Sequence, residues 1–214
     1  MNITESARTE ALVISLLNDC YQPRERVGDH VTDLLWCMRK SYYNVTAPLA
    51  PPMELQLHFL RGQVLHAMLQ AGAELPEVSV ECDGIVGSID ELIDDTVVEY
   101  KTTNISVGKS AYELPDEWWR QIMAYCHMAG VTKARLVVLH LQGDWKKNRL
   151  PQIKAYDVEF TEVELKDNWQ TMVNRHKWLW ESVKNEAPPP AVATFMCEGC
   201  PYLERCASEL EKTK

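Results

Sequence analysis

The sequence of 214 residues lacks long hydrophobic runs: no stretch approaches the about 20 apolar residues that a helix needs to cross a bilayer. Its first residues also lack the basic segment and the long apolar stretch of a secretory signal peptide. No internal repeat is present. We therefore expect a cytoplasmic protein that binds no membrane, in a reducing setting where its seven cysteines do not form a disulfide framework.

Positive charge is scarce as well. The chain carries 22 basic and 31 acidic residues, so its formal net charge is −9. This balance argues against binding of duplex DNA through a broad basic surface, although a narrow basic groove is compatible with it. Four local basic clusters could line such a groove or simply face solvent: Arg24/Arg26, Arg39/Lys40, Lys146/Lys147/Arg149 and Arg175/His176/Lys177.

The sequence does contain enough apolar material for a core. Hydrophobic residues make up 46% of the chain and seven residues are Trp, which excludes a disordered protein. The order of expected elements is helices, a strand hairpin, a helix, strands and a long helix, which predicts an α/β domain with a mixed central sheet. We divide this one integrated domain into an N-terminal helical region (1–75), a core (76–186) and a C-terminal cysteine-rich segment (187–214).

Caps, turn residues and periodicity place the individual elements. The helix at 53–70 is apolar on two faces, which predicts that it is buried. The other expected helices lie at 34–38 after a cap at Thr32 or Asp33, at 117–127 between Asp116 and Gly130, and from a capping box of Thr161 and Glu164 to about residue 185. Strands are expected at 78–90 with breaks at Asp83-Gly84 and Gly87, at 96–102, at 134–141 with both sheet faces covered, and at 153–160.

The hairpin between the first two long strands carries charged residues that would meet. If residues 94–95 form a two-residue turn, Asp90 falls opposite Glu99, and opposed residues project from the same sheet face. Lys101 is two residues beyond Glu99 and shares that face. Because facing carboxylates repel unless a cation lies between them, this register predicts a site for Mg²⁺ or Mn²⁺. The alternative is an acidic surface hairpin with a weak pair between Glu99 and Lys101.

A metal-dependent hydrolysis would give each of these residues a task. Asp90 and Glu99 would hold the ion, which polarises a phosphodiester and helps to generate hydroxide. Lys101 would orient the attacking water or stabilise charge on the phosphorane. The pattern of an Asp followed by Glu-x-Lys therefore favours a nuclease.

Residues on two expected helices could complete this site. His66 could be a further metal ligand through its neutral imidazole, or a core residue with satisfied hydrogen bonds. Gln121 and Tyr125, at i and i+4 on one helix face, could bind a substrate phosphate and orient the lysine, or form an ordinary exposed pair. Trp118 and Trp119 could stack on bases of single-stranded DNA or pack in the core.

Four cysteines at the two ends of the chain predict a metal centre. Cys197-x-x-Cys200 has chelate spacing, Cys206 follows, and Cys37 would be the fourth ligand. Four thiolates suit structural zinc or an iron–sulfur cluster, and the split of one plus three with a proline after a cysteine favours the cluster. Either metal would join the two ends of the chain. The other cysteines, Cys20, Cys82 and Cys126, are expected to be buried.

Taken in order, these motifs resemble one family. The set is Cys37-x-Arg39-Lys40, Gly62-x3-His66, Gly87-x-x-Asp90, Glu99-x-Lys101, Gln121-x3-Tyr125 and Cys197-x2-Cys200-x5-Cys206. It is similar to the CRISPR-associated RecB-like exonucleases, here called the Cas-four family. The resemblance runs from about Val31 to Cys206; each motif alone is weak and the joint order is specific.

The resemblance implies a fold and an activity. It implies a PD-(D/E)XK nuclease core whose N- and C-terminal parts are joined by an iron–sulfur cluster, with 4Fe-4S favoured over 2Fe-2S. It implies cleavage of single-stranded DNA with Mg²⁺ or Mn²⁺ and trimming of pre-spacers for the CRISPR adaptation integrase. The catalytic residues would be His66, Asp90, Glu99 and Lys101, with the Tyr100 carbonyl as a further metal ligand and Gln121 and Tyr125 in support.

The sequence therefore predicts an exonuclease acting on single-stranded DNA ends. The expected DNA path uses Arg39, Lys40 and Arg120 together with Trp118 and Trp119. A non-catalytic DNA-binding or scaffold subunit with a structural metal centre is one alternative. A phage or recombination nuclease outside any CRISPR locus is another, and the oligomeric state stays open.

Overall fold

The computed structural model describes residues 7–20, 27–70 and 76–211. Its helices are α1 (Ala7–Cys20), α2 (Val31–Leu35), α3 (Met38–Thr46), α4 (Met53–Gln70), α5 (Asp116–Ala129), α6 (Glu162–Lys184) and α7 (Leu203–Glu211), with 3₁₀ turns η1 (Ala111–Glu113) and η2 (Phe195–Cys197). Its strands are β1 (Asp29–His30), β2 (Pro76–Cys82), β3 (Ile85–Ile93), β4 (Thr96–Thr103), β5 (Lys133–His140) and β6 (Gln152–Glu159). Among the helices in these ranges, none combines the length and hydropathy of a membrane span.

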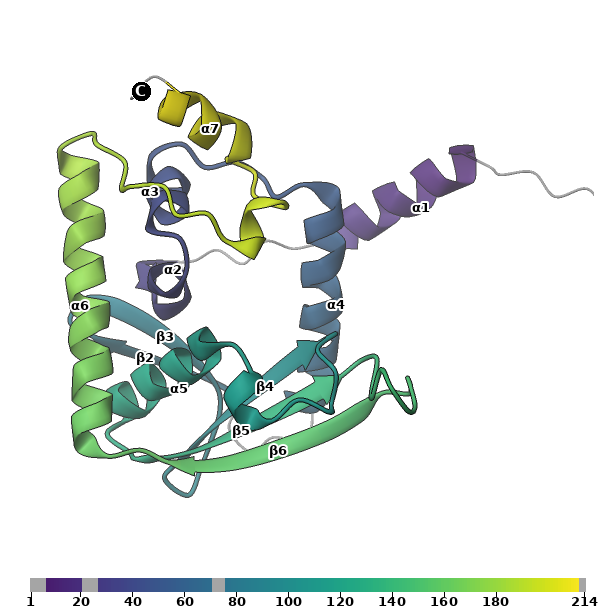
Figure 1. Ribbon diagram of the computed structural model, residues 1–214, viewed down its shortest axis with the longest axis vertical. Helices are drawn as coiled ribbons and strands as arrows, with labels where there is room; N and C mark the ends of the chain where they lie inside the picture. The colour runs from purple at the N-terminus through teal and green to yellow at the C-terminus, as the bar shows by residue number, and fades with distance from the viewer. Residues whose placement is uncertain (1–6, 21–26, 71–75, 212–214) are drawn as a thin grey trace, which may run out of the picture.

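The strands form a mixed six-stranded sheet, which confirms the predicted α/β class. Its order is β1-β3-β4-β5-β6, and β2 pairs with β3. β1 pairs parallel to β3 and β4 pairs parallel to β5, whereas the other pairs are antiparallel. In Figure 1 the sheet lies at one end of the molecule, and α3, α7 and the segment between α6 and α7 lie at the other.

The hairpin of β3 and β4 has the predicted turn. Ile93 pairs with Thr96, and the turn residues Asp94 and Asp95 have φ of 42° and 61°. Two successive positive φ values define a type I′ turn, whose twist matches that of the flanking strands. This turn fixes the register that brings the charged residues of the two strands to one face.

The core forms where α5 packs on the sheet and α6 packs on α5 (Figure 1). Ile122 of α5, Leu136 of β5 and Met172 of α6 are fully buried at this junction. Gly130 ends α5 with φ of 70°, and Thr161 caps α6 by accepting a hydrogen bond from the Glu164 amide. Both of these predicted helix boundaries are confirmed.

Gly87 does not break a strand, contrary to the prediction. It lies inside β3, where a Cβ would come within 3.0 Å of Met128, Tyr125 and Val80 side-chain atoms. The glycine therefore permits α5 to approach β3 closely. The other predicted break, at residues 83–84, is the turn between β2 and β3.

Helix α4 has the predicted bounds but not the predicted burial. Phe59, Val64 and Met68 are 39%, 51% and 69% exposed. The helix contacts β4 and α1 and stands at the margin of the sheet (Figure 1). Periodicity shows which faces are apolar, but it does not show whether another element covers them.

Three local details also differ from the prediction. The helix expected at 34–38 is split, because α2 ends before Trp36 and Cys37 is the N-cap of α3. His30, not Thr32 or Asp33, is the N-cap of α2, and Pro115, not Asp116, is that of α5. Strand β5 alternates between exposed and buried residues over its first half, so only one of its faces is fully covered there.

Candidate active site

A cleft of about 270 Å³ opens where β3, β4, α4 and α5 meet. The side chains that line it come from these elements and from β1, β2 and the start of α2: His30, Thr32, His66, Glu77, Ser88, Asp90, Glu99, Lys101, Gln121 and Tyr125. The structure thus brings together the four proposed catalytic side chains and both supporting ones, Gln121 and Tyr125, from positions up to 59 residues apart. Trp118 and Trp119 do not line the cleft.

Glu99 is the buried centre of the cleft, with 2% of its surface exposed. Its Oε1 accepts hydrogen bonds from Lys101 Nζ at 2.5 Å and from Gln121 Nε2 at 3.0 Å. Its Oε2 is buried and has no hydrogen-bond partner among the described residues. Burial raises the pKa of Glu99 to about 7, and Asp90 adds to the rise while Lys101 opposes it.

Asp90 lines the same cleft as Glu99, in agreement with the shared sheet face that the hairpin register predicts. The β3–β4 ladder ends at the pair Glu91–Val98, and the Asp90 carboxylate takes the place of the next rung because its Oδ2 accepts the Tyr100 amide at 2.8 Å. Its Oδ1 lies 3.5 Å from His66 Nδ1 on α4. A strand and a helix therefore orient both oxygens of this carboxylate.

Gln121 links the charged groups to one another. Its Oε1 accepts from Lys101 Nζ at 2.8 Å, and its Nε2 also donates to the Tyr125 hydroxyl at 3.0 Å. Gln121 and Tyr125 are 7% and 3% exposed, so they are not the exposed pair that was one alternative. The amide therefore contacts the lysine in the cleft, and its orienting role stays a prediction.

The carboxylates fit a hard divalent cation. An orphaned carboxylate oxygen in a buried site is costly unless a positive charge reaches it. Glu99 Oε2 is such an atom, and Asp90 and His66 lie at the same cleft. Within the described residues no group of three His, Cys, Asp or Glu is already arranged as a metal site. Asp90 and Glu99 would hold Mg²⁺ or Mn²⁺, with His66 and the Tyr100 carbonyl as the further predicted ligands.

Four cleft residues were not singled out from the sequence. Ser88 could have been found, because it lies two residues before Asp90 on the same strand and so shares its face. His30, Thr32 and Glu77 gave no such signal, since they enter from β1, α2 and β2.

The residues expected along a DNA path have varied surroundings. Trp118 and Trp119 are partly buried against the core, and Trp119 meets Tyr156 edge to face with ring centroids 6.5 Å apart. Arg120 is exposed. Lys40 is partly buried and lines the cysteine cavity described next.

The four predicted cysteine ligands come together in space. Cys37, Cys197, Cys200 and Cys206 line one cavity of about 40 Å³ and form no disulfide. Burial raises the pKa of the Cys206 thiol, and the three other thiols add to the rise while Arg39 opposes it. The four thiols are chemically suited to bind a metal. Among the described residues, however, no three of them lie close enough together to hold one. Of the other cysteines, Cys126 is buried as expected, Cys82 is partly exposed, and the side chain of Cys20 lies outside the described residues.

A polar clamp beside this cavity joins α3 to α7. Arg39 is 7% exposed, and its Nη2 lies 2.6 Å from Glu209 Oε2. Its Nε donates to the Tyr43 hydroxyl at 3.1 Å, and its Nη1 donates to the Pro189 carbonyl at 3.3 Å. Tyr43 in turn donates to Glu209. The Arg39 guanidinium is therefore engaged inside the protein, so the structure gives no support to its expected place on a DNA path.

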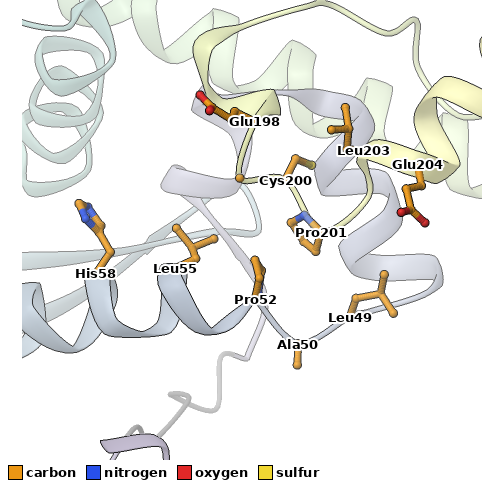
Figure 2. A pocket seen from close by; sticks show the side chains of 11 residues that line it. Leu49, Ala50, Pro52, Leu55, His58, Glu198, Cys200, Pro201, Leu203 and Glu204 are labelled. Carbon is orange, nitrogen blue, oxygen red and sulfur yellow. The ribbon is translucent and has the colours of Figure 1, made fainter. Parts of the chain in front are cut away.

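An open groove of about 1160 Å³ adjoins the cysteine cavity (Figure 2). Leu55 and His58 of α4 line one side, and Glu198, Cys200 and Pro201 line the other. Cys200 lines both the groove and the cavity. The groove also carries Glu204, so its acidic side is unsuited to a phosphate backbone.

A family model decides the identity of the fold. The model of the PD-(D/E)XK nuclease superfamily matches residues 17–207. The chain belongs to the PD-(D/E)XK nuclease superfamily. The tripeptide Glu99-Tyr100-Lys101 matches the (D/E)XK pattern in this name. Nucleases of the superfamily generally use divalent metals such as Mg²⁺ or Mn²⁺.

One solved structure agrees with this fold. The crystal structure of SSO0001 has a TM-score of 0.59 and 20% identity, over 95% of this chain and 98% of that one. LHK-Exo in complex with dAMP has a TM-score of 0.46 and 16% identity over 86% and 94%. The alkaline exonuclease LHK-Exo from Laribacter hongkongensis has a TM-score of 0.40 and 14% identity over 97% and 89%. No curated protein sequence matches the chain.

Proposed function

We propose that this chain is a Mg²⁺- or Mn²⁺-dependent exonuclease that degrades single-stranded DNA from an end. The observation that carries the proposal is the buried, unpartnered Oε2 of Glu99 beside Asp90 and Lys101 in one cleft. Membership of a nuclease superfamily supports hydrolysis of phosphodiesters. The preference for single strands draws support from the net charge of −9, which disfavours a broad duplex-binding face.

Lys101 has a defined part in the proposed reaction. A lysine ammonium has three N–H donors, and two of them are used by Glu99 Oε1 and Gln121 Oε1. The third is left to donate to the attacking water or to the charge that develops on the phosphoryl oxygens. Because both acceptors are buried, the ammonium is held in place before substrate binds.

The carboxylates divide the remaining tasks. A bound divalent cation would polarise the phosphodiester and lower the pKa of a bound water. Glu99 offers Oε2 to that cation, since its Oε1 is already taken by two donors. Asp90 is oriented by the Tyr100 amide and lies beside His66, so the two acidic side chains would hold a cation from neighbouring strands.

We further propose that the four cysteines hold an iron–sulfur cluster, with 4Fe-4S favoured. The convergence of the four thiols on one cavity supports this assignment, and their spacing resembles that of the Cas-four family. The same resemblance supports a role in trimming pre-spacers for the CRISPR adaptation integrase. A phage or recombination nuclease would use the same chemistry without that partner. Iron and zinc content and the visible spectrum of anaerobically purified protein test the cluster directly: one zinc per chain and no colour would refute it.

The proposed activity is tested with three DNA substrates of equal length and sequence in Mn²⁺: a linear single strand, a circular single strand and a blunt duplex. We expect the linear strand to be shortened progressively, the circular strand to resist degradation, and the duplex to be degraded more slowly than the linear strand. Degradation of the circular strand at the rate of the linear strand would show an endonuclease. Degradation of the duplex at the same or a higher rate would refute the preference for single strands. Binding without hydrolysis would favour a scaffold subunit.

A further inference from the structure

The loop between β5 and β6 carries an unusual surface for so acidic a chain. Residues 144–150, DWKKNRL, place Lys146, Lys147 and Arg149 within four positions of one another, and all three are exposed. No ion pair engages any of these three side chains within the part of the chain that the structure describes. Trp145, next to them, is 53% exposed. This combination of free cations and an accessible ring is typical of surfaces that bind single-stranded nucleic acid.

The loop has a defined conformation that presents these side chains outward. The Asp144 amide donates to the Asn148 carbonyl at 2.8 Å, and the Asn148 amide returns a bond to Asp144 at 3.0 Å. Asp144 Oδ1 also accepts the Lys146 amide at 2.9 Å. The internal hydrogen bonds use the backbone and the Asp144 and Asn148 side chains, so the basic and aromatic side chains are not needed to form the loop.

The loop is also tied to the strand that carries the catalytic lysine. The Leu141 amide donates to the Thr103 carbonyl at 2.8 Å, and the Val107 amide donates to the Gly143 carbonyl at 2.9 Å. Thr103 lies two residues beyond Lys101 on β4, a separation of about 7 Å along a strand. Figure 1 shows the connections that follow β4 and β5 leaving the same end of the sheet. The residues that lead into loop 144–150 are therefore close to the cleft.

We propose that loop 144–150 is a docking site for the single strand outside the cleft, with Lys146, Lys147 and Arg149 on phosphates and Trp145 stacked on a base. The inference deepens the proposed function and rests on it, because a strand whose end occupies the cleft must leave along one of its margins. Single-stranded DNA fits better than a duplex because the cations cover only one short loop. The chain as a whole would repel a second, parallel line of phosphates.

The test separates binding from hydrolysis. The triple variant K146A/K147A/R149A is compared with K166A/K177A/K184A, which removes the same charge from exposed positions of α6. Binding of a fluorescent single strand longer than the about 4–16 nucleotides of a typical site is measured by anisotropy in metal-free buffer at several salt concentrations. Hydrolysis of that strand and of a trinucleotide is measured separately in Mn²⁺.

We expect the loop variant to bind the long strand more weakly, with the slope of log Kd against log salt reduced by about 2, because each phosphate contact of a single strand contributes about 0.7. Trp145→Ala should weaken binding about tenfold and Trp145→Phe much less, since Phe keeps a stacking face. The loop variant should cleave the trinucleotide at the wild-type rate, whereas the α6 variant should match wild type throughout.

Equal affinity and salt slope in the loop and α6 variants would overturn the docking site, whatever the hydrolysis data show. So would an equal loss of trinucleotide cleavage and long-strand binding, which would place the defect in the cleft. If wild type hydrolyses neither substrate, the proposed function fails, but the metal-free binding data still decide the fate of the docking site.

Discussion

The candidate catalytic cleft and the cysteine cavity both unite residues that are far apart in the sequence, yet they are built differently. In the cleft, hydrogen bonds from Tyr100, Lys101 and Gln121 hold the two carboxylates, and the buried oxygen left over belongs to Glu99. In the cavity, four thiols converge without a metal-binding arrangement, and the polar contacts that close the structure belong to Arg39 and Tyr43 beside it. Backbone register and side-chain hydrogen bonds build the first site, whereas the second would be completed only by the proposed metal cluster.

The largest expected effect is at Glu99. Glu99→Gln keeps the shape of the side chain but removes the charge that would hold the cation, so we expect DNA hydrolysis to fall by at least about 10²–10³-fold. Glu91→Gln is the matched control, because Glu91 is an equally buried carboxylate on the adjoining strand whose Oε2 accepts from the Tyr100 hydroxyl. Initial rates on linear single-stranded DNA in Mn²⁺ measure both. Comparable losses in the two variants would mean that any buried charge in the hairpin matters.

A smaller effect is expected at Gln121, which positions the charged groups without holding the cation itself. Gln121→Ala removes the contacts to Lys101 and Glu99, and loss of such supporting groups typically costs about 10–100-fold. Tyr125→Phe removes only the hydroxyl that accepts from Gln121, so its loss should be smaller. Rates at saturating and limiting DNA would test this order, and a Tyr125 variant worse than the Gln121 variant would contradict it.

The clamp near the cysteines should affect stability rather than chemistry. Arg39→Ala removes one of the two cations beside the partly buried Glu209 carboxylate and leaves Arg205 as the other. We expect a loss of about 1–3 kcal/mol in the free energy of unfolding. Arg135→Ala breaks an ion pair of the same 2.6 Å length that is 47% and 72% exposed, and it should change nothing measurable. Urea titration of both variants makes the comparison, and equal stability losses would show that burial does not set the strength of the clamp.

The same clamp should respond to pH with a known sign. Burial alone would raise the pKa of Glu209, yet hydrogen bonds from Tyr43, Arg205 and Arg39 outweigh it and lower that pKa. A carboxylate with a lowered folded-state pKa stabilises the fold above its unfolded value of 4.5 and loses that effect on acidification. The stability difference between wild type and Glu209→Gln should therefore shrink below about pH 4.5. A difference that grows on acidification would reverse the assigned sign.

The comparison of the cleft with the cysteine cavity also explains which features could be predicted from the sequence. Residues 94–95 set the register, so the meeting of Asp90, Glu99 and Lys101 followed from a turn and a period of two. Cysteine spacing likewise foretold the shared cavity. The clamp could not be predicted, because Arg39 and Glu209 are 170 residues apart and carry no motif. The exposure of α4 was missed for a related reason: the sequence does not state which element lies over a helix face.

The central claim is that the unpartnered carboxylate oxygen of Glu99 is part of a binding site for a divalent cation. Mn²⁺ binding to the wild-type protein, Glu99→Gln and Glu91→Gln, measured by calorimetry without DNA at pH 8, tests it most directly. We predict a saturable Mn²⁺ site in the wild type and in Glu91→Gln that weakens by at least about tenfold in Glu99→Gln. Equal Mn²⁺ affinity in all three proteins would contradict the assignment.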